Sequence, residues 1–276
     1  MNRLPNFLIL GAAKAGTTAL YYYLRQHPQI YMTPLKETNF FALKDKPLNF
    51  CGPGDDNYVN RMSITCLEQY QQQFDGVRDE TAIGEASPLY LYEPKAAACI
   101  KEHVPDAKLL VILRNPIDRA YSAFVHLVRD GRETTRDFAE ALTLEDERIA
   151  AGWEHIWHYK KMGLYAEQLE RYFALFGREN VRVDLYYDFK TRPVELMQEI
   201  FAYLDVDNTF APDISQRYNE ASVPHEARPP LLPSVRAQLL DYFRDDSLRV
   251  QQLIGRDLSR WLQLGSPDAG LKPLAN

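Results

Sequence analysis

The eight residues from Gly11 to Thr18, Gly-Ala-Ala-Lys-Ala-Gly-Thr-Thr, are suited to binding an anion. Small residues let a backbone wrap closely around a phosphate, and the N–H groups and dipole at the start of a helix stabilise its charge. Lys14 adds a full positive charge, and Thr17 and Thr18 add hydroxyl donors. The segment therefore predicts a phosphate-binding loop between a strand and a helix.

This loop differs from a Walker A loop, in which a Lys stands directly before the Ser or Thr that binds magnesium. Here Lys14 lies inside the loop, and Gly16 directly precedes Thr17. A Lys at that place would lie near the bridging oxygen of a terminal group. The simpler alternative is a turn that carries a surface lysine, because glycine turns between strands and helices are common.

A second anion site is predicted over Arg114–Ser122, which follows a strongly apolar run. An Arg that leaves the carboxyl end of a strand lies where open α/β sheets bind ligands. Its guanidinium can grip a phosphate through two parallel hydrogen bonds. Ser122 lies further along the helix that follows and can donate a second contact. In the alternative interpretation, Arg114 forms a surface ion pair with Asp118.

Two residues are candidates for proton transfer. Glu37 lies beside Lys36 and just ahead of two phenylalanines, so we expect partial burial to raise its pKa and make it a better base. His126 lies one helical turn after Ser122 and shares its face. The alternatives are a solvated Glu–Lys pair and a structural histidine. His155, His158 and His225 lie in no comparable context, and no role is assigned to them.

The segments that must position these residues alternate between strand-like and helix-like patterns. This alternation predicts an α/β fold with a mainly parallel sheet. The expected strands are Phe7–Leu10, Val181–Tyr187 and Lys108–Leu113, the last being an apolar run typical of burial on both faces. The expected helices are Thr17–Gln26, Pro116–Arg129, Gly163–Phe176, Pro193–Leu204 and Pro233–Ile254. Two stretches rich in turn residues are expected to be irregular, Pro47–Asn60 and Asp205–Pro230.

The composition is that of an ordinary folded protein, with 276 residues, 46% hydrophobic and 25% charged. No repeat or linker divides the chain, so we expect one domain over residues 1–276. The formal net charge of −6 argues against nucleic acid as a partner. No membrane span or signal peptide is visible, which favours a soluble, cytoplasmic protein. The three cysteines lack CxxC spacing and indicate neither a disulfide framework nor a zinc site.

Residues Leu8–Leu20, followed by His27-Pro28, resemble the 5′-phosphosulfate loop of the sulfotransferases that use 3′-phosphoadenosine 5′-phosphosulfate (PAPS). The resemblance is closest to the branch that modifies heparan-type glycosaminoglycans, namely the N-sulfotransferase domain and the 3-O-sulfotransferases. It implies the sulfotransferase fold, a single P-loop-like domain with a central, mainly parallel sheet flanked by helices. It also implies that Lys14 stabilises the leaving phosphate, and that the loop residues that bind PAPS are Lys14, Ala15, Gly16, Thr17 and Thr18.

The same family implies roles for the other motifs. Arg114 and Ser122 match the pair that binds the 3′-phosphate. The run Lys36–Phe41 is similar to the Lys-Glu-x-x-Phe-Phe motif of the glycosaminoglycan enzymes, in which the Glu removes the acceptor proton. His126 matches a histidine of the N-sulfotransferase that assists proton transfer near the acceptor. The catalytic residues implied by the resemblance are therefore Lys14, Glu37 and His126.

The chain departs from the family at several positions. The 3-O-sulfotransferases carry a His where this chain has Asn39, and a substrate-binding Lys where it has Ala86. Their late cofactor-binding loop has no recognisable equivalent in Asn219–Pro230. Tyr186, at the end of the last expected strand, is a candidate contact to the nucleoside. Substitutes for the missing loop residues would be Arg217 or Arg228.

We therefore expect a sulfotransferase that moves a sulfuryl group from PAPS to a hydroxyl or amine. The acceptor would be a glycan, a lipid-linked sugar or a small molecule. No metal is expected, because the sequence offers no evident carboxylate cluster for magnesium. Two alternatives stay open: a P-loop kinase that uses ATP and magnesium, and a non-catalytic module that binds a nucleotide or a glycan.

Overall fold

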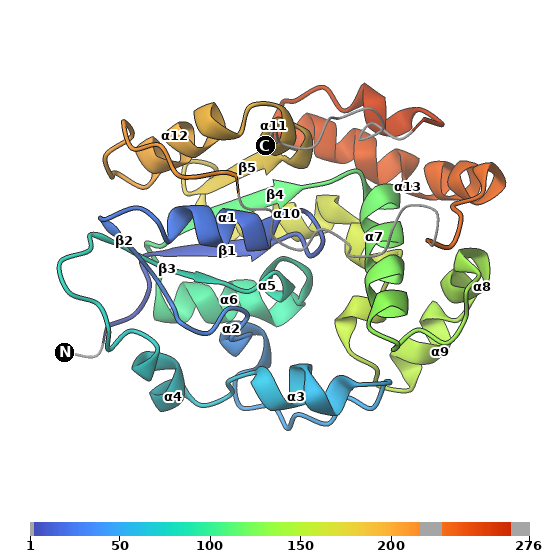
Figure 1. The fold of residues 1–276 in the computed structure, drawn as a ribbon, viewed down its shortest axis with the longest axis horizontal. Helices are drawn as coiled ribbons and strands as arrows, with labels where there is room; N and C mark the ends of the chain where they lie inside the picture. The colour runs from blue at the N-terminus through green and yellow to red at the C-terminus, as the bar shows by residue number, and fades with distance from the viewer. Residues whose placement is uncertain (1–2, 216–227, 266–276) are drawn as a thin grey trace.

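The computed structural model describes residues 3–215 and 228–265. These residues form one five-stranded sheet with helices on both of its faces (Figure 1). The strand order is β2-β3-β1-β4-β5, and every neighbouring pair is parallel. The expected α/β class with a mainly parallel sheet is confirmed. The strands are β1 (Phe7–Gly11), β2 (Ile30–Met32), β3 (Ala82–Ala86), β4 (Lys108–Leu113) and β5 (Val181–Leu185).

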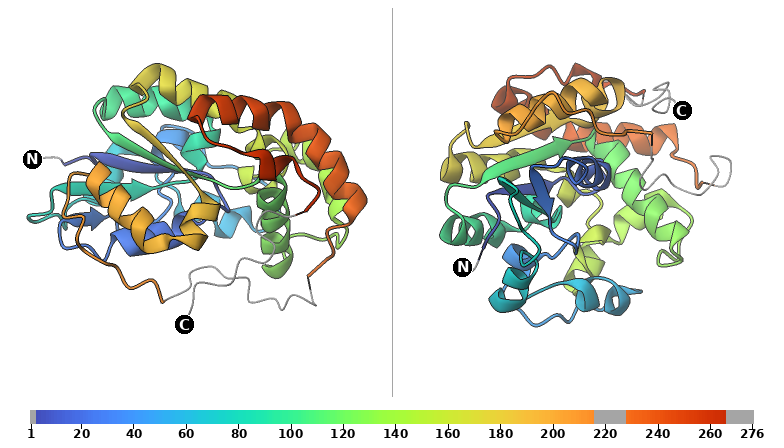
Figure 2. Two further views of the ribbon diagram at one scale, coloured as in Figure 1. Left: turned by 90° about the horizontal axis from the view of Figure 1, so that it is seen from above. Right: turned by 60° about the vertical axis from the view of Figure 1, so that its left-hand side comes forward.

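The two central strands are apolar because helices cover both faces of the sheet. The side chains of Phe7–Leu10 and Leu109–Leu113 are at most 1% exposed. Helices α1 (Thr17–Leu24) and α12 (Pro193–Tyr203) lie on one face, and α6 (Pro94–His103) and α10 (Tyr165–Phe176) lie on the other (Figure 2). This burial fixes where β1 and β4 end, and hence where the loops that follow them lie.

The longer of the remaining helices are α7 (Pro116–Arg129) and α13 (Pro233–Ile254). Helix α7 follows β4 and stands at the carboxyl ends of the strands (Figure 1). Its start is capped by Asn115, whose Oδ1 accepts hydrogen bonds from the N–H groups of Ile117 at 3.0 Å and Asp118 at 3.2 Å. The shorter helices are α2 (Phe40–Leu43), α3 (Val59–Met62), α4 (Leu67–Gln72), α5 (Leu89–Tyr92), α8 (Phe138–Thr143), α9 (Glu145–Ala150) and α11 (Tyr186–Thr191), and the 3₁₀ helices are η1 (Asp55–Asn57), η2 (His155–Trp157), η3 (Lys161–Gly163) and η5 (Ser259–Leu262).

Local patterns located most of the long elements. The expected bounds of β4, α7 and α13 are confirmed, and the first strand and helix differ by one or two residues at their ends. The expectation that a strand continues to Tyr187 is wrong, because the chain turns into α11 at Tyr186. Part of Pro47–Asn60 is helical, contrary to the expectation of irregular structure, because η1 and the start of α3 fall within it.

Two strands at one side of the sheet were not predicted from the sequence. Strand β2 has only three residues, and β3, with sequence Ala-Ile-Gly-Glu-Ala, contains no continuous apolar run. Each is recognisable only through its pairing with a neighbouring strand. The described parts of Asp205–Pro230 contain no helix or strand, as expected, and Arg217 lies outside the described residues.

Candidate active site

A pocket of about 410 Å³ opens where the loops after β1 and β4 meet. Its walls come from segments that are distant in sequence, including residues within 13–19, 36–39, 58–62 and 154–156. Of the site residues expected from the sequence, those that line the pocket are Lys14, Gly16, Thr17, Thr18, Glu37, Arg114, Ser122 and His126. Ala15 does not line it: its side chain is fully buried, and its N–H donates to the carbonyl oxygen of Ala12 at 3.1 Å.

The loop after β1 presents the start of α1 to the pocket. The residue that precedes the helix, Gly16, has a φ of 94°, in the left-handed region that favours glycine. A Cβ at Gly16 would lie 3.3 Å from ring atoms of both Phe189 and Tyr186. No side chain caps the helix, and its first turn has no acidic residue. The helix dipole therefore favours an anion at this end of the pocket.

Lys14 and Arg114 bring positive charge to the same end. Burial, with the nearby charge of Arg129, lowers the pKa of Lys14 to about 8, although Glu37 opposes that change. The Arg114 guanidinium donates to the carbonyl oxygen of Lys14 at 3.2 Å and lies over the Tyr186 ring, 4.6 Å from its centroid. Lys14 is thus mostly protonated at neutral pH. The position of Arg114 is fixed by its hydrogen bond to the loop after β1.

The alternative in which Arg114 pairs with Asp118 at the surface is not what the structure shows. The Asp118 carboxylate is buried and forms an ion pair with Arg236. The guanidinium of Arg114 instead reaches the pocket, which Ser122 also lines from the second turn of α7. Arg114 and Ser122 therefore lie on one wall, beside the ring of Tyr186.

The segment that carries Glu37 is tied to the end of β3 by its backbone. The Glu37 N–H donates to the carbonyl oxygen of Ala86 at 2.9 Å, and the Asn39 N–H donates to Ser87 Oγ, also at 2.9 Å. Ser87 in turn donates to the buried carboxyl of Glu85. Glu37 and Asn39 adopt φ values of 66° and 55°, which are uncommon for residues with side chains. These hydrogen bonds offset that backbone strain and fix Glu37 at the pocket wall.

The expectation of a raised pKa for Glu37 is wrong. Burial acts to raise it, but the charges of Lys36 and Lys14 outweigh burial and hold the pKa of Glu37 below its ordinary value. Lys36 pairs directly with the carboxylate, and 49% of the Glu37 side chain is exposed. Glu37 is therefore ionised at neutral pH, so the carboxylate is always ready to accept a proton but is a weaker base than expected.

His126 faces the same pocket from α7. Burial and the charge of Lys14 lower the pKa of His126 well below its ordinary value, so the ring is neutral at pH 7. Its Nδ1 accepts a hydrogen bond from Arg129 at 2.7 Å, and its Nε2 lies 3.6 Å from Asp130 Oδ2. A neutral ring with Nδ1 occupied presents its remaining N–H towards Asp130.

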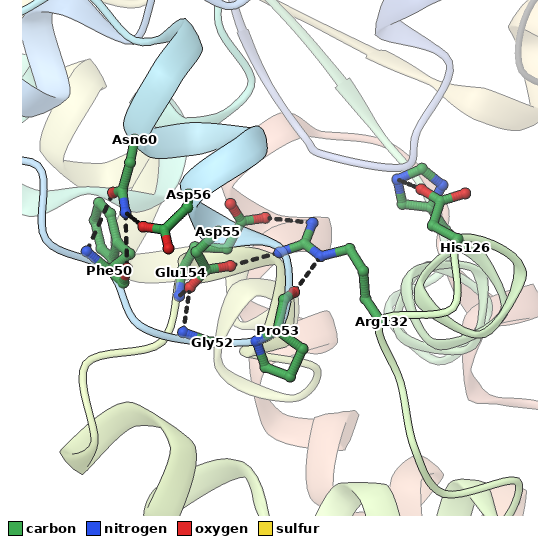
Figure 3. A network of polar contacts seen from close by, with 10 residues as sticks. Phe50, Gly52, Pro53, Asp55, Asp56, Asn60, His126, Arg132 and Glu154 are labelled. Carbon is green, nitrogen blue, oxygen red and sulfur yellow. Dashed lines mark hydrogen bonds and ion pairs between the residues drawn. The ribbon is translucent and has the colours of Figure 1, made fainter.

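Three pocket residues with a charged or imidazole side chain were given no role from the sequence: Arg132, Glu154 and His155. Arg132 follows α7 and pairs with the buried carboxylate of Asp55, and its Nη1 lies 3.3 Å from Glu154 Oε1 (Figure 3). It also donates to the carbonyl oxygen of Pro53 at 2.6 Å. These contacts join three separate segments, and no local spacing in the sequence signals them.

Two further properties concern residues 3–215 and 228–265. Within them, no three His, Cys, Asp or Glu side chains are grouped so that they could hold a metal ion. No helix of this part of the chain is long and apolar enough to cross a membrane.

Known sulfotransferases are similar to this chain over most of its length. The profile of the sulfotransferase family matches residues 5–210. A crystal structure of a sulfotransferase from Alicyclobacillus acidocaldarius is 45% identical, with a TM-score of 0.86, over 95% of this chain and all of that one. The membrane-associated sulfotransferase kil1 of Dictyostelium discoideum is 22% identical over 94% of this chain. The bifunctional heparan sulfate N-deacetylase/N-sulfotransferase 3 of Mus musculus is 26% identical over 95% of this chain.

The match covers different shares of these relatives. The chain spans 66% of the Dictyostelium protein and 31% of the mouse protein. By contrast, the family profile covers most of this chain, including the loop after β1, the Glu37 segment, the start of α7 and β5. The chain therefore belongs to the sulfotransferase family.

Proposed function

We propose that this enzyme transfers a sulfuryl group from PAPS to a hydroxyl or amine of a glycan or glycan-like acceptor. One arrangement carries this proposal: a cationic helix start and a carboxylate line the same pocket. Lys14 and Arg114 lie at the end that suits an anionic donor. Glu37 lies on the wall formed by another segment, where an acceptor hydroxyl could reach it.

The residues at the donor end fit a nucleotide with two phosphate-type groups. The start of α1, with Lys14, Thr17 and Thr18, suits the 5′-phosphosulfate, because backbone N–H groups and a lysine converge there. Arg114 and Ser122 suit the 3′-phosphate. Support for a second, separate anion position comes from the guanidinium itself, which stacks on an aromatic ring that could also contact the nucleoside.

PAPS supplies a sulfuryl group that is activated by its bond to a phosphate. Glu37 takes the proton of the acceptor while the acceptor oxygen or nitrogen forms its bond to sulfur. Lys14 stabilises the charge left on the 5′-phosphate as the bond between sulfur and the bridging oxygen breaks. His126 assists near the acceptor by positioning Arg129 and Asp130, the partners of its two ring nitrogens. Catalysis is then mostly a matter of positioning and electrostatic stabilisation, with no step that requires a covalent enzyme intermediate.

The test is calorimetric titration with adenosine 3′,5′-bisphosphate and, in parallel, with ATP and magnesium. The bisphosphate should bind without metal, and Arg114→Ala should weaken that binding by roughly 2–5 kcal/mol. Arg249→Ala is the matched control, because Arg249 forms an exposed ion pair with Glu170. Its affinity should equal that of the wild type. Binding of ATP and magnesium in place of the bisphosphate would refute the proposal and favour a kinase.

A further inference from the structure

One half of the pocket wall differs from the donor end in composition. It is formed by those residues of 36–39, 58–62, 88–89, 132 and 154–156 that line the pocket, Arg61 not being one of them, and we call it the acceptor wall. Its apolar members are Tyr58, Val59, Met62, Pro88, Leu89 and Ile156. Tyr58 and Met62 are each 48% exposed and are four residues apart, so they can present one apolar edge at the mouth of the pocket. Exposed apolar side chains beside a pocket commonly mark a binding surface.

The cations of the acceptor wall are already neutralised. Lys36 pairs with Glu37, and the nearly buried Arg132 pairs with both Asp55 and Glu154 (Figure 3). His155 lies 3.5 Å from a carboxylate oxygen of Glu93. Within the part of the chain that the structure describes, the acceptor wall thus offers no unpaired positive charge. Sulfated or uronic-acid polymers need such charges to offset the cost of removing their anionic groups from water.

Glu154 places a second carboxyl group on this wall. Its side chain is only 12% exposed, and Arg132 at 3.3 Å is the sole ion-pair partner that the described residues provide. Burial raises the pKa of Glu154 to about 7; Asp55 adds to that rise and Arg132 opposes it. Because Glu37 balances Lys36 and Asp55 balances Arg132, the carboxyl group of Glu154 makes the acceptor wall neutral to negative around pH 7. An anionic acceptor would meet like charge there.

Resting on the function proposed above, we propose that the acceptor is an uncharged hydroxyl compound with an apolar face, such as a neutral sugar joined to an apolar group. Glu154 is then a specificity-determining residue that disfavours anionic acceptors. The apolar edge at Tyr58 and Met62 packs against the apolar face, and Glu37 takes the proton of the hydroxyl. A heparan-type polymer is correspondingly a poor acceptor.

The test compares two acceptors that differ only in charge: 4-nitrophenyl β-D-glucuronide and its neutral methyl ester. Sulfated product is measured by mass spectrometry with PAPS as donor, and binding of each glycoside is measured on enzyme loaded with adenosine 3′,5′-bisphosphate. We expect kcat/KM for the ester to exceed that for the free acid by about ten-fold or more, the effect of like charge at close range. Heparosan, an unsulfated uronic-acid polymer, should be sulfated no faster than the free acid.

Three variants test whether the acceptor wall causes the preference for the ester over the free acid. Glu154→Gln should reduce the ratio of ester to free acid to about two- or three-fold, because it removes a charge but keeps an oxygen for Arg132. Glu195→Gln, the same change at an exposed position on α12, should leave the ratio unaltered. Met62→Lys adds a cation at the exposed edge of the pocket. Because Met62 is half exposed, the change should not disturb folding, and it should raise kcat/KM for the free acid.

The possible negative results can be told apart. If the wild type does not bind adenosine 3′,5′-bisphosphate, the proposed function itself is wrong. If the bisphosphate binds but the free acid or heparosan is sulfated faster than the ester, the acceptor inference is wrong while the function stands. The acceptor inference is equally wrong if the loaded enzyme neither binds nor sulfates the ester. An unchanged ratio in Glu154→Gln would remove Glu154 from the role of selecting acceptors.

Discussion

Glu85 should make the stability of this enzyme depend on pH in a way that one substitution can remove. Its side chain is fully buried at the end of β3, and it accepts a hydrogen bond from Ser87, which also holds the backbone of the Glu37 segment. Burial raises the pKa of Glu85 from its ordinary value of 4.5 to about 7, although the hydrogen bond from Ser87 opposes that rise. The folded protein therefore keeps a proton that the unfolded chain has released.

The sign and size of the effect follow from this difference in proton binding. Between about pH 4.5 and 7 the folded state binds more protons than the unfolded state, so the free energy of unfolding falls as the pH rises. Above about pH 7 both states are ionised, and the contribution of Glu85 becomes constant. Between pH 5 and 8 the loss amounts to about 2.5 kcal/mol, from 1.36 kcal/mol for each unit of pKa difference. Glu85→Gln mimics the protonated form and does not titrate.

The assay is denaturant unfolding of the wild type and Glu85→Gln at several pH values from 5 to 8. Other buried groups also titrate, but they contribute to both proteins, so the difference between the two curves isolates Glu85. The variant should gain stability relative to the wild type by roughly 2–3 kcal/mol over this range. Glu195→Gln, at an exposed site, should show no such change. Parallel curves for wild type and Glu85→Gln would refute the reasoning.

Three further predictions concern the pocket. Lys14→Ala and Glu37→Gln should each reduce turnover by roughly 10²–10⁴-fold, because each removes charge stabilisation or the base, while circular dichroism shows an unchanged fold. The pKa of Lys14 is lowered to about 8, so turnover should fall as the pH rises through 8 and the cation is lost; a pH profile that stays flat to pH 10 would contradict this role. Gly16→Ala places a side chain at a φ of 94° and should cost about 1–2 kcal/mol of stability, measured as a lower Tm, and should also weaken binding of the bisphosphate.

Much of the donor end could be predicted from the sequence because its chemistry is local. Gly16, Thr17 and Lys14 lie within a few residues of one another, directly after an apolar strand, and this order alone positions a helix start next to a cation. The apolar run of β4 likewise predicts a central strand, and Arg114 follows it at the carboxyl end. In a parallel sheet both loops must emerge at the same edge, so the convergence of the two motifs follows from the strand assignments.

The acceptor wall could not be predicted in this way, because its properties arise between distant segments. Strand β3 lacks a continuous apolar run and is not recognisable without its neighbour β1, yet it anchors the Glu37 segment. The pKa of Glu37 falls rather than rises because Lys36 pairs directly with its carboxylate, and because folding also brings Lys14 close to it. Arg132 meets Asp55 and Glu154 only once η1 and the loop after α9 pack together. Patterns of neighbouring residues determined the fold class and the donor loop, whereas electrostatic coupling through space, which depends on distance and burial, was decided by the tertiary structure alone.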